Sequence, residues 1–185
     1  MKFYLRKGDG CVRILGIDPG LAIVGWGVIE AVGGRFYPVA CGAITTPAHT
    51  SVDLRLSMIY DDLSTLMDKY APEAMAIEEL FFNHNQTTAI PVAEARGVAL
   101  LCARQHGLSI EEYTPMQVKQ AVVGYGLAEK KQVIAMVTSL LKLPAPPKPD
   151  DTADALAIAL CHGQNAGSAR YAYEKKMEDM HRVGK

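Results

Sequence analysis

Residues 13–45, RILGIDPGLAIVGWGVIEAVGGRFYPVACGAIT, contain three extended segments that follow one another closely. The segments are residues 13–18, 23–31 and 35–45, and a glycine pair at 33–34 supplies a tight turn between the last two. Two extended segments joined by such a turn are typical of a hairpin. The stretch therefore predicts three consecutive antiparallel strands.

After residue 45 the pattern alternates between helices and strands. Apolar residues recur at helical spacing up to Pro72, and the short apolar strand AMAIEEL follows. Pro91 is tolerated only in the first turn of its helix. Prolines between residues 143 and 151 forbid helix, because they remove backbone donors and restrict the preceding residue. The predicted helices are residues 51–70, 87–106, 115–123, 128–141 and 151–162, and the further strands are residues 74–80 and 109–113.

This order predicts an α/β fold with a mixed five-stranded sheet, three antiparallel strands first and helices on both faces. A chain of 185 residues is long enough for one good core but short for two domains. We expect one domain at residues 12–165 and a mobile tail at residues 166–185. Residues 1–11 are expected to be a disordered extension, or to reflect a start assigned too early.

The composition is that of an ordinary soluble globular protein, with 49% hydrophobic and 21% charged residues. No apolar run approaches the ~20 residues of a membrane helix, and the N-terminus lacks the apolar core of a signal peptide. We therefore expect a cytoplasmic protein without a membrane partner. The formal net charge of -1 neither requires nor excludes a nucleic-acid partner. The four cysteines include no CxxC pair, so neither a zinc knuckle nor a disulfide framework is indicated.

Four acids stand at the ends of predicted elements. Asp18 closes the first strand, Glu78 closes a later strand, and Asp151 and Asp154 open the last helix. Strand ends are where an open sheet presents side chains to a site. The spacing of Asp151 and Asp154 places both on one helical face. If that helix packs across the strand ends, the four carboxylates converge.

Each acid also has a purely structural explanation. Asp18 before a Pro-Gly pair is an ordinary turn residue, Asp151 suits a helix N-terminus, and Asp154 fits a solvated face. Glu78 is harder to explain, because burying a lone carboxylate is costly. Together, clustered carboxylates repel one another unless a cation joins them. Oxygen ligands without nearby Cys or His favour Mg²⁺ or Mn²⁺, and two such ions support hydrolysis of a phosphodiester.

Five longer motifs occur in a fixed order: ILGIDPG, AIEELFF, EARGVAL, QVKQAVVGYGLAEKKQV and DDTADALAIAL. With this order and spacing, residues 12–163 resemble the RuvC family, the bacterial Holliday junction resolvases. The resemblance implies an RNase H-like fold, a homodimer, and Mg²⁺-dependent symmetric nicking of four-way DNA junctions in recombination and DNA repair. It also implies partnership with the branch-migration proteins RuvA and RuvB.

The resemblance implies roles for the charged residues of these motifs. The catalytic, metal-binding acids of the family fall on Asp18, Glu78, Asp151 and Asp154, although some relatives carry a histidine at the position of Asp151. The functionally important lysines of the family fall on Lys119 and Lys130, for catalysis and DNA binding. The alternative for both lysines is a solvated helix charge, the usual environment of lysine.

The aromatic residue of the family that stacks on a junction base falls on Phe81. Stacking on an unpaired base is worth ~1–3 kcal/mol, which offsets the cost of exposing a phenylalanine in a polar loop. We expect Phe81 to contact DNA and Phe82 to pack inside. The alternatives are that both residues are core residues, or that Phe82 shares the stacking.

Four further residues are assigned outside the acid site. Arg96 and Arg104 are candidates for a basic surface, whereas Cys102 and His106, one turn apart on a helix without further ligands, are interpreted as structural. A two-fold dimer would present two identical sites to a roughly two-fold junction. The candidate interface, which could equally belong to the core, is the helix at 87–106 through Ala93, Val98, Leu100 and Leu101.

Three other functions fit parts of the sequence. A different RNase H-like nuclease, acting on RNA or simple duplex DNA, would share the acids. An ATPase of the actin and sugar-kinase class also begins with a glycine-containing Asp turn, but it needs a second domain that 185 residues scarcely allow. A junction-binding protein without activity would have lost the acids, and all four are present.

Overall fold

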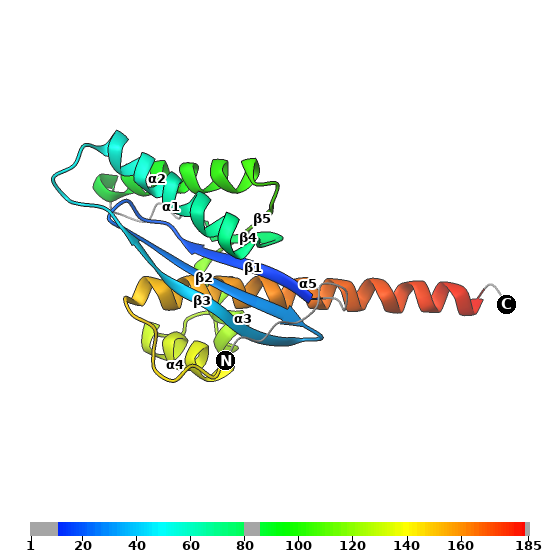
Figure 1. Ribbon diagram of the computed structural model, residues 1–185. Coiled ribbons are helices and arrows are strands. Elements are labelled where there is room, and N and C mark those ends of the chain that lie inside the picture. Colours follow the sequence, from blue (N-terminus) through cyan, green and yellow to red (C-terminus); the bar gives the residue numbers. More distant parts are fainter. Residues whose placement is uncertain (1–10, 80–85, 184–185) are drawn as a thin grey trace.

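The computed structural model describes residues 11–79 and 86–183, with side chains described for residues 11–79 and 89–166. Strands come first, and helices then alternate with strands (Figure 1). The elements are β1 (Cys11–Asp18), β2 (Ile23–Val32), β3 (Arg35–Thr45), α1 (Val52–Tyr70), β4 (Ala74–Glu78), α2 (Gln86–Gln105), β5 (Ser109–Tyr113), α3 (Pro115–Val123), α4 (Lys130–Leu140) and α5 (Asp150–Val183).

The five strands form one mixed sheet in the order β3-β2-β1-β4-β5. The first three strands pair antiparallel, whereas β4 lies parallel to β1 and β5 lies parallel to β4. The predicted fold class is thus confirmed, including the three antiparallel strands at its start. The positive φ angles of Gly33 and Gly34, 54° and 78°, fit the tight turn between β2 and β3, because glycine adopts this region without steric cost.

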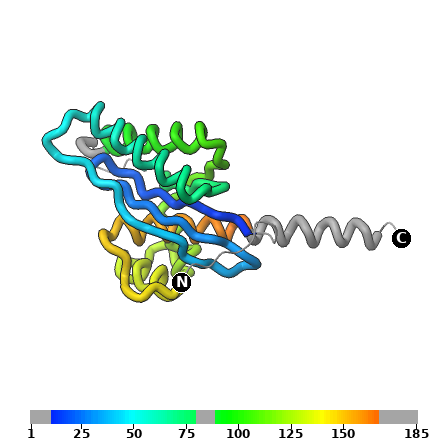
Figure 2. The backbone as a smooth tube through the Cα atoms, viewed as in Figure 1, coloured from blue at the N-terminus to red at the C-terminus, as the bar shows by residue number. Residues whose placement is uncertain are grey.

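Helices cover both faces of the sheet, as predicted. Helices α1 and α2 lie on one face and α3, α4 and α5 on the other, as the backbone trace also shows (Figure 2). Successive residues of a strand point to opposite faces. Leu15 and Ile17 of β1 therefore pack toward α1 and α2, whereas Ile14 packs with Leu156 and Ile158 of α5.

Helix α5 lies unusually close to the sheet because glycines face it. A Cβ atom on Gly16 of β1 would overlap the carbonyl oxygen of Ala155, and one on Gly27 of β2 would lie 2.6 Å from Leu156 Cδ2. The two glycines are opposite each other in the β1–β2 register. The flat surface they create lets the helix backbone approach the strands directly, which fixes α5 across the middle of the sheet.

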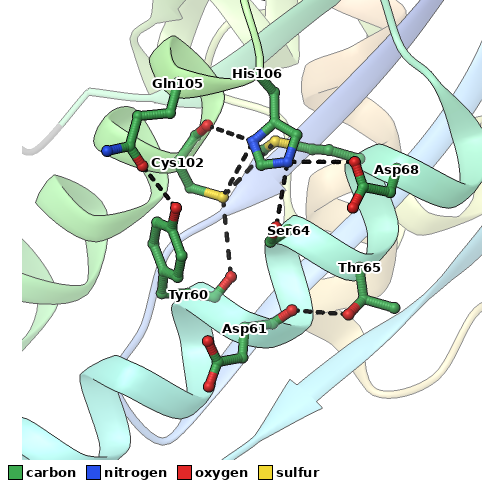
Figure 3. Close-up of polar contacts among 9 residues, drawn as sticks. Tyr60, Asp61, Ser64, Thr65, Asp68, Cys102, Gln105 and His106 are labelled. Atoms are coloured by element: carbon green, nitrogen blue, oxygen red, sulfur yellow. Dashed lines mark hydrogen bonds and ion pairs between the residues drawn. The ribbon is translucent and has the colours of Figure 1, made fainter.

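A polar cluster joins α1 to α2 on the other face (Figure 3). His106 Nδ1 donates to the Cys102 carbonyl oxygen at 2.8 Å, and His106 Nε2 lies 3.2 Å from Ser64 Oγ and 3.5 Å from Asp68 Oδ1. Tyr60 also donates to Gln105 across the two helices at 2.6 Å. Cys102 and His106 thus tie one helix to the next, in agreement with their structural interpretation.

Two details differ from the sequence prediction. Pro91 lies inside α2, beyond its first turn, so the helix tolerates the proline where we expected only an N-terminal position. Helix α5 continues to Val183 instead of ending near residue 162. The sequence after residue 162 lacks an apolar stripe, but it contains no proline and many good helix formers, so intrinsic propensity favours continuation. The expected extension at residues 1–11 lies almost entirely outside the described residues.

Candidate functional site

The ends of β1 and β4 bring the first two acids together. These strands are parallel neighbours in which Ile17 pairs with Ile77, so Asp18 and Glu78 follow side by side at the same edge. Both lie two residues beyond positions that face α5, Gly16 and Ala76, and strand alternation therefore turns both carboxylates toward α5. The backbone N–H of the adjacent Glu79 donates to the Tyr113 carbonyl oxygen at 2.9 Å, which ties the end of β4 to β5.

The first turn of α5 supplies the other two acids. Gly25 of β2 pairs with Asp18 of β1, and a Cβ atom on Gly25 would overlap the carbonyl oxygen of Asp151. The helix start therefore rests directly on the strand end that carries Asp18. Asp154 lies one turn further on the same helical face. The four predicted acids, drawn from β1, β4 and α5, thus converge, and each is partly exposed to solvent.

The electrostatics reflect this convergence. Burial and the charges of Asp154, Glu78 and Asp151 raise the pKa of Asp18 from 3.8 to about 7. Burial and the charge of Asp154 also raise the pKa of Glu78, although Lys119 and Lys130 oppose this shift. Like-charged carboxylates in a partly desolvated place favour a proton or a cation. The site therefore concentrates negative charge beyond what its own lysines neutralise.

Both predicted lysines border the acids. Lys130, the first residue of α4, places Nζ 2.9 Å from Asp154 Oδ2 and 3.8 Å from Asp150 Oδ2. Burial opposes protonation of Lys130, but the hydrogen bond to Asp154 and the nearby carboxylates raise its pKa overall. Lys119 of α3 lies near enough to Glu78 for its charge to lower the pKa of that carboxyl. All six charged residues predicted for the site therefore lie together.

The chemistry of the acids fits a hard divalent cation. Their donors are carboxylate oxygens, and burial together with the neighbouring carboxylates raises the pKa of Asp18. Within the part of the chain whose residues are described, no three Asp, Glu, His or Cys side chains already surround one point as metal ligands. Asp154 instead contacts Lys130. The charge and the donor atoms of these residues thus fit a hard divalent cation.

Arg96 of α2 holds the strand end that carries Glu78. Its Nε donates to the Glu78 carbonyl oxygen at 3.1 Å, and its Nη2 forms an ion pair with Glu112 of β5. The Arg96 side chain is 15% exposed. The sequence suggested this residue only for a basic surface; the structure shows it fastening β4 to α2 and β5. The cue available in sequence was an arginine just before the apolar end of the helix motif EARGVAL.

Other predicted residues stand apart from the acids or cannot be placed. Phe81 and Phe82 lie outside the described residues. In α2, Val98 and Leu100 pack against the core while Leu101 remains 55% exposed, so only part of the candidate dimer surface is available. Arg104 is exposed at the far end of the same helix. Among the described residues, no helix has both the length and the apolar character needed to cross a membrane.

Comparison with known proteins now identifies the family. The model of the family described as crossover junction endodeoxyribonuclease RuvC matches residues 14–162. The RuvC protein of Heliobacterium modesticaldum is 60% identical over 148 residues, covering 80% of this chain and 91% of the relative. That of Desulfitobacterium hafniense is 57% identical over 152 residues, covering 82% and 92%.

Solved structures agree with the sequence relatives. Thermus thermophilus RuvC in complex with a Holliday junction substrate superimposes with a TM-score of 0.81 at 36% identity, covering 85% of this chain and 96% of that one. The yeast mitochondrial Holliday junction resolvase Ydc2 shares the fold, with a TM-score of 0.63 at 15% identity and coverage of 90% and 84%. With the family match spanning the sheet and all four acids, this chain belongs to the RuvC family of crossover junction endodeoxyribonucleases.

Proposed function

We propose that this chain resolves Holliday junctions in recombination and DNA repair, as a homodimer that nicks two strands symmetrically. Membership of the RuvC family supports this function, and a relative was solved with a Holliday junction substrate. The single observation that carries it is the convergence of Asp18, Glu78, Asp151 and Asp154 beside Lys119 and Lys130. An acid cluster bordered by cations suits a phosphodiester substrate.

The four acids would hold Mg²⁺, with Mn²⁺ as a substitute and two ions per site. When bound, such ions activate a water and stabilise the leaving oxygen of a phosphodiester. The contribution of the chain is to fix the carboxylates. Strand β1 positions Asp18, and the first turn of α5, which rests on Gly25, positions Asp151 and Asp154. The end of β4, which Arg96 holds, positions Glu78.

The lysines act on the phosphate in this proposal. Lys130 is 52% exposed and Lys119 is partly exposed, so both ammonium groups have access to a DNA strand laid across the acids. A lysine beside a scissile phosphate orients it and offsets its developing charge. Phe81 would stack on an unpaired junction base, with Phe82 packing or sharing the contact. Comparing junction binding by Phe81→Ala and Phe82→Ala assigns the stacking, and a defect confined to Phe82→Ala would reverse our assignment.

We further propose RuvA and RuvB as partners and the cytoplasm as the location. A disordered extension at residues 1–11 and a mobile tail at 166–185 would flank the nuclease domain at 12–165. Co-sedimentation of the full chain with RuvA and RuvB on junction DNA tests the partnership. Sedimentation of the chain alone tests the dimer.

The central test is cleavage of a labelled four-way junction by Asp18→Asn with Mg²⁺ or Mn²⁺ present. We expect loss of nicking with either ion, while the matched variant Asp62→Asn, an exposed acid of α1, cuts as the unmodified protein does. Full activity of Asp18→Asn would refute the catalytic assignment. A competition with excess linear duplex then separates junction selectivity from general nuclease activity, because a junction resolvase should keep binding the junction.

A further inference from the structure

Three large apolar side chains stand exposed around the connection between α3 and α4. Met116 is 63% exposed, Tyr125 57% and Leu127 71%. We call these three residues the loop ridge. Single exposed apolar residues are ordinary, but a cluster of them marks an interaction surface. None of the three residues belongs to the acid site, and their exposed side chains contribute little to the core.

The connection holds the loop ridge in a fixed form. Gly124, at φ 82°, ends α3, and its carbonyl oxygen accepts from Gln120 Nε2 at 2.9 Å. The backbone N–H of Ala128 donates to the Tyr125 carbonyl oxygen at 3.1 Å, and Ala128 itself is buried. A Cβ atom on Gly126 would lie 2.7 Å from Met116 Cγ, so Met116 covers the glycine. Tyr125 and Leu127 are thus presented outward from an anchored backbone.

The loop ridge adjoins the phosphate-binding lysines. Met116 and Lys119 are three residues apart on α3 and therefore share one helix face. Leu127 precedes Lys130 by three residues, and Lys130 contacts Asp154. Lys131 is exposed next to it, whereas Glu129 is the one acid of this short segment. Lys119, Lys130 and Lys131 therefore lie next to the loop ridge in the chain, and Lys130 connects this segment to the acid cluster through its ion pairs with Asp154 and Asp150.

We propose that the loop ridge is a DNA contact, in which Tyr125 stacks on an unpaired base of the cleaved strand next to the scissile phosphate. This inference rests on the proposed function and adds a second recognition point to it. Charge complementarity favours this occupant, because the backbone on either side of the stacked base would face Lys119, Lys130 and Lys131. A preformed aromatic platform with lysines at its edge is the arrangement that single-stranded nucleic acids favour. Met116 and Leu127 would cover the edges of the base.

The test measures binding separately from cleavage. Anisotropy of a labelled four-way junction at fixed salt is compared for Tyr125→Ala, Tyr125→Phe and Leu54→Ala, each in the Asp18→Asn background. Leu54 is the matched control, 57% exposed on α1 at the opposite face of the sheet. We expect Kd to rise at least about fivefold for Tyr125→Ala, and to stay within about twofold for the other two.

A fluorescent base analogue locates the contact. 2-Aminopurine is placed at each position flanking the cut, and stacking on Tyr125 should quench it at one position with tyrosine or phenylalanine, but not with alanine. Wild-type-like Kd for Tyr125→Ala, or unchanged quenching, would overturn the proposal. So would weaker binding accompanied by a smaller sedimenting species, because the loop ridge would then be a protein contact. Failure of the proposed function would appear instead as unimpaired cutting by Asp18→Asn.

Discussion

At the scale of single residues, the acid cluster is costly to the fold that carries it. Burial and three neighbouring carboxylates raise the pKa of Asp18 to about 7. The raised pKa means that ionised Asp18 is less favourable in the folded chain than in the unfolded chain. Lys130 compensates Asp154 directly, but Asp18 has no comparable ion pair among the described residues. The catalytic role that we propose for Asp18 would therefore reduce the stability of the metal-free fold.

Asp18→Asn should consequently stabilise the metal-free protein. The amide occupies nearly the same volume but carries no charge, so at pH 8 repulsion within the cluster falls. With chelator present in both samples, calorimetry should give a higher Tm for Asp18→Asn than for the unmodified protein. The variant should nevertheless have lost its cleavage activity. Added Mg²⁺ should raise the Tm of the unmodified protein more than that of the variant. A lower Tm for the variant in chelator would contradict the repulsion argument.

Variants of Arg96 test whether cleavage depends on the exact position of Glu78, because they keep Glu78 but remove the contact that holds its strand end. Arg96→Met removes both the hydrogen bond to the Glu78 carbonyl and the ion pair with Glu112. We expect kcat to fall about tenfold or more, because small displacements of a catalytic group are costly, while junction Kd changes little. Glu112→Gln removes only the partly exposed ion pair and should cost about 1 kcal/mol or less of stability.

The Glu112→Gln variant separates the two contacts of Arg96. If Glu112→Gln lowers kcat as much as Arg96→Met does, the ion pair and not the Glu78 carbonyl contact controls the site. Arg96→Lys should recover part of the kcat that Arg96→Met loses. The Mg²⁺ concentration needed for half-maximal cleavage should lie between those of Arg96→Met and the unmodified protein. A variant that loses thermal stability alone, with unchanged kcat, would make Arg96 merely structural.

At the scale of elements, most boundaries followed from local pattern. The β3 and α3 ranges agree with the predicted 35–45 and 115–123, because strand composition, the Thr114 cap and Gly124 are local signals. The convergence of the acids was predictable from their places at element ends. The close seating of α5 was not, because it depends on which strand residues are opposite each other. Two glycines two residues apart in β2, Gly25 and Gly27, were the available cue.

Gly25 should therefore be intolerant of a side chain. Gly25→Ala places a methyl group against the Asp151 carbonyl oxygen, so α5 must shift where it carries the site. We expect a loss of about 1–3 kcal/mol in the free energy of unfolding, together with a marked loss of cleavage. The control is Gly97→Ala in α2, where nothing lies within 4 Å; it should stabilise by about 1 kcal/mol and leave cleavage unchanged. Equal effects of both substitutions in urea unfolding would refute this account.

The contact between β5 and α5 predicts a pH effect on stability. His162 is buried, and its Nδ1 lies 2.9 Å from the Tyr113 hydroxyl oxygen. Burial lowers the pKa of His162 below 6.5, although the charge of Glu111 opposes the shift. The unfolded chain thus binds a proton more readily than the folded chain. Stability is full above pH 6.5 and falls as the pH drops toward the lowered pKa.

Replacement of His162 should flatten this dependence. His162→Gln keeps a polar partner for Tyr113 but cannot be protonated, so its stability should decline less between pH 7 and about pH 5. Chemical unfolding across this range measures the difference, with His49→Gln, an exposed loop residue, as the control. An equal decline in the His162→Gln protein would assign the acid sensitivity to other groups.

At the scale of the whole molecule, the sheet separates two tasks. Apolar side chains pack under the helices on both faces, under α1 and α2 on one face and under α3, α4 and α5 on the other (Figure 1). The first face also has the His106 polar link, whereas the acids, the two lysines and the loop ridge belong to the second. All four acids lie in one chain, so in the proposed function each chain would form one complete site. Two cuts in a junction therefore require two chains, and the proposed dimer supplies one site for each cut.

Mixed dimers test this division directly. Chains with and without Asp18→Asn are co-expressed with different tags, and the heterodimer is isolated by successive affinity steps. Because each site is complete within its own chain, the intact site should still cut, whereas the partner site should not.

On a plasmid with an extruded cruciform, paired cuts yield a linear product and a single nick yields an open circle. We expect the unmodified dimer to give mainly linear product, the heterodimer open circles, and the Asp18→Asn dimer neither. Linear product from the heterodimer at the unmodified rate would mean that one site makes both cuts, and the two-site dimer would be wrong.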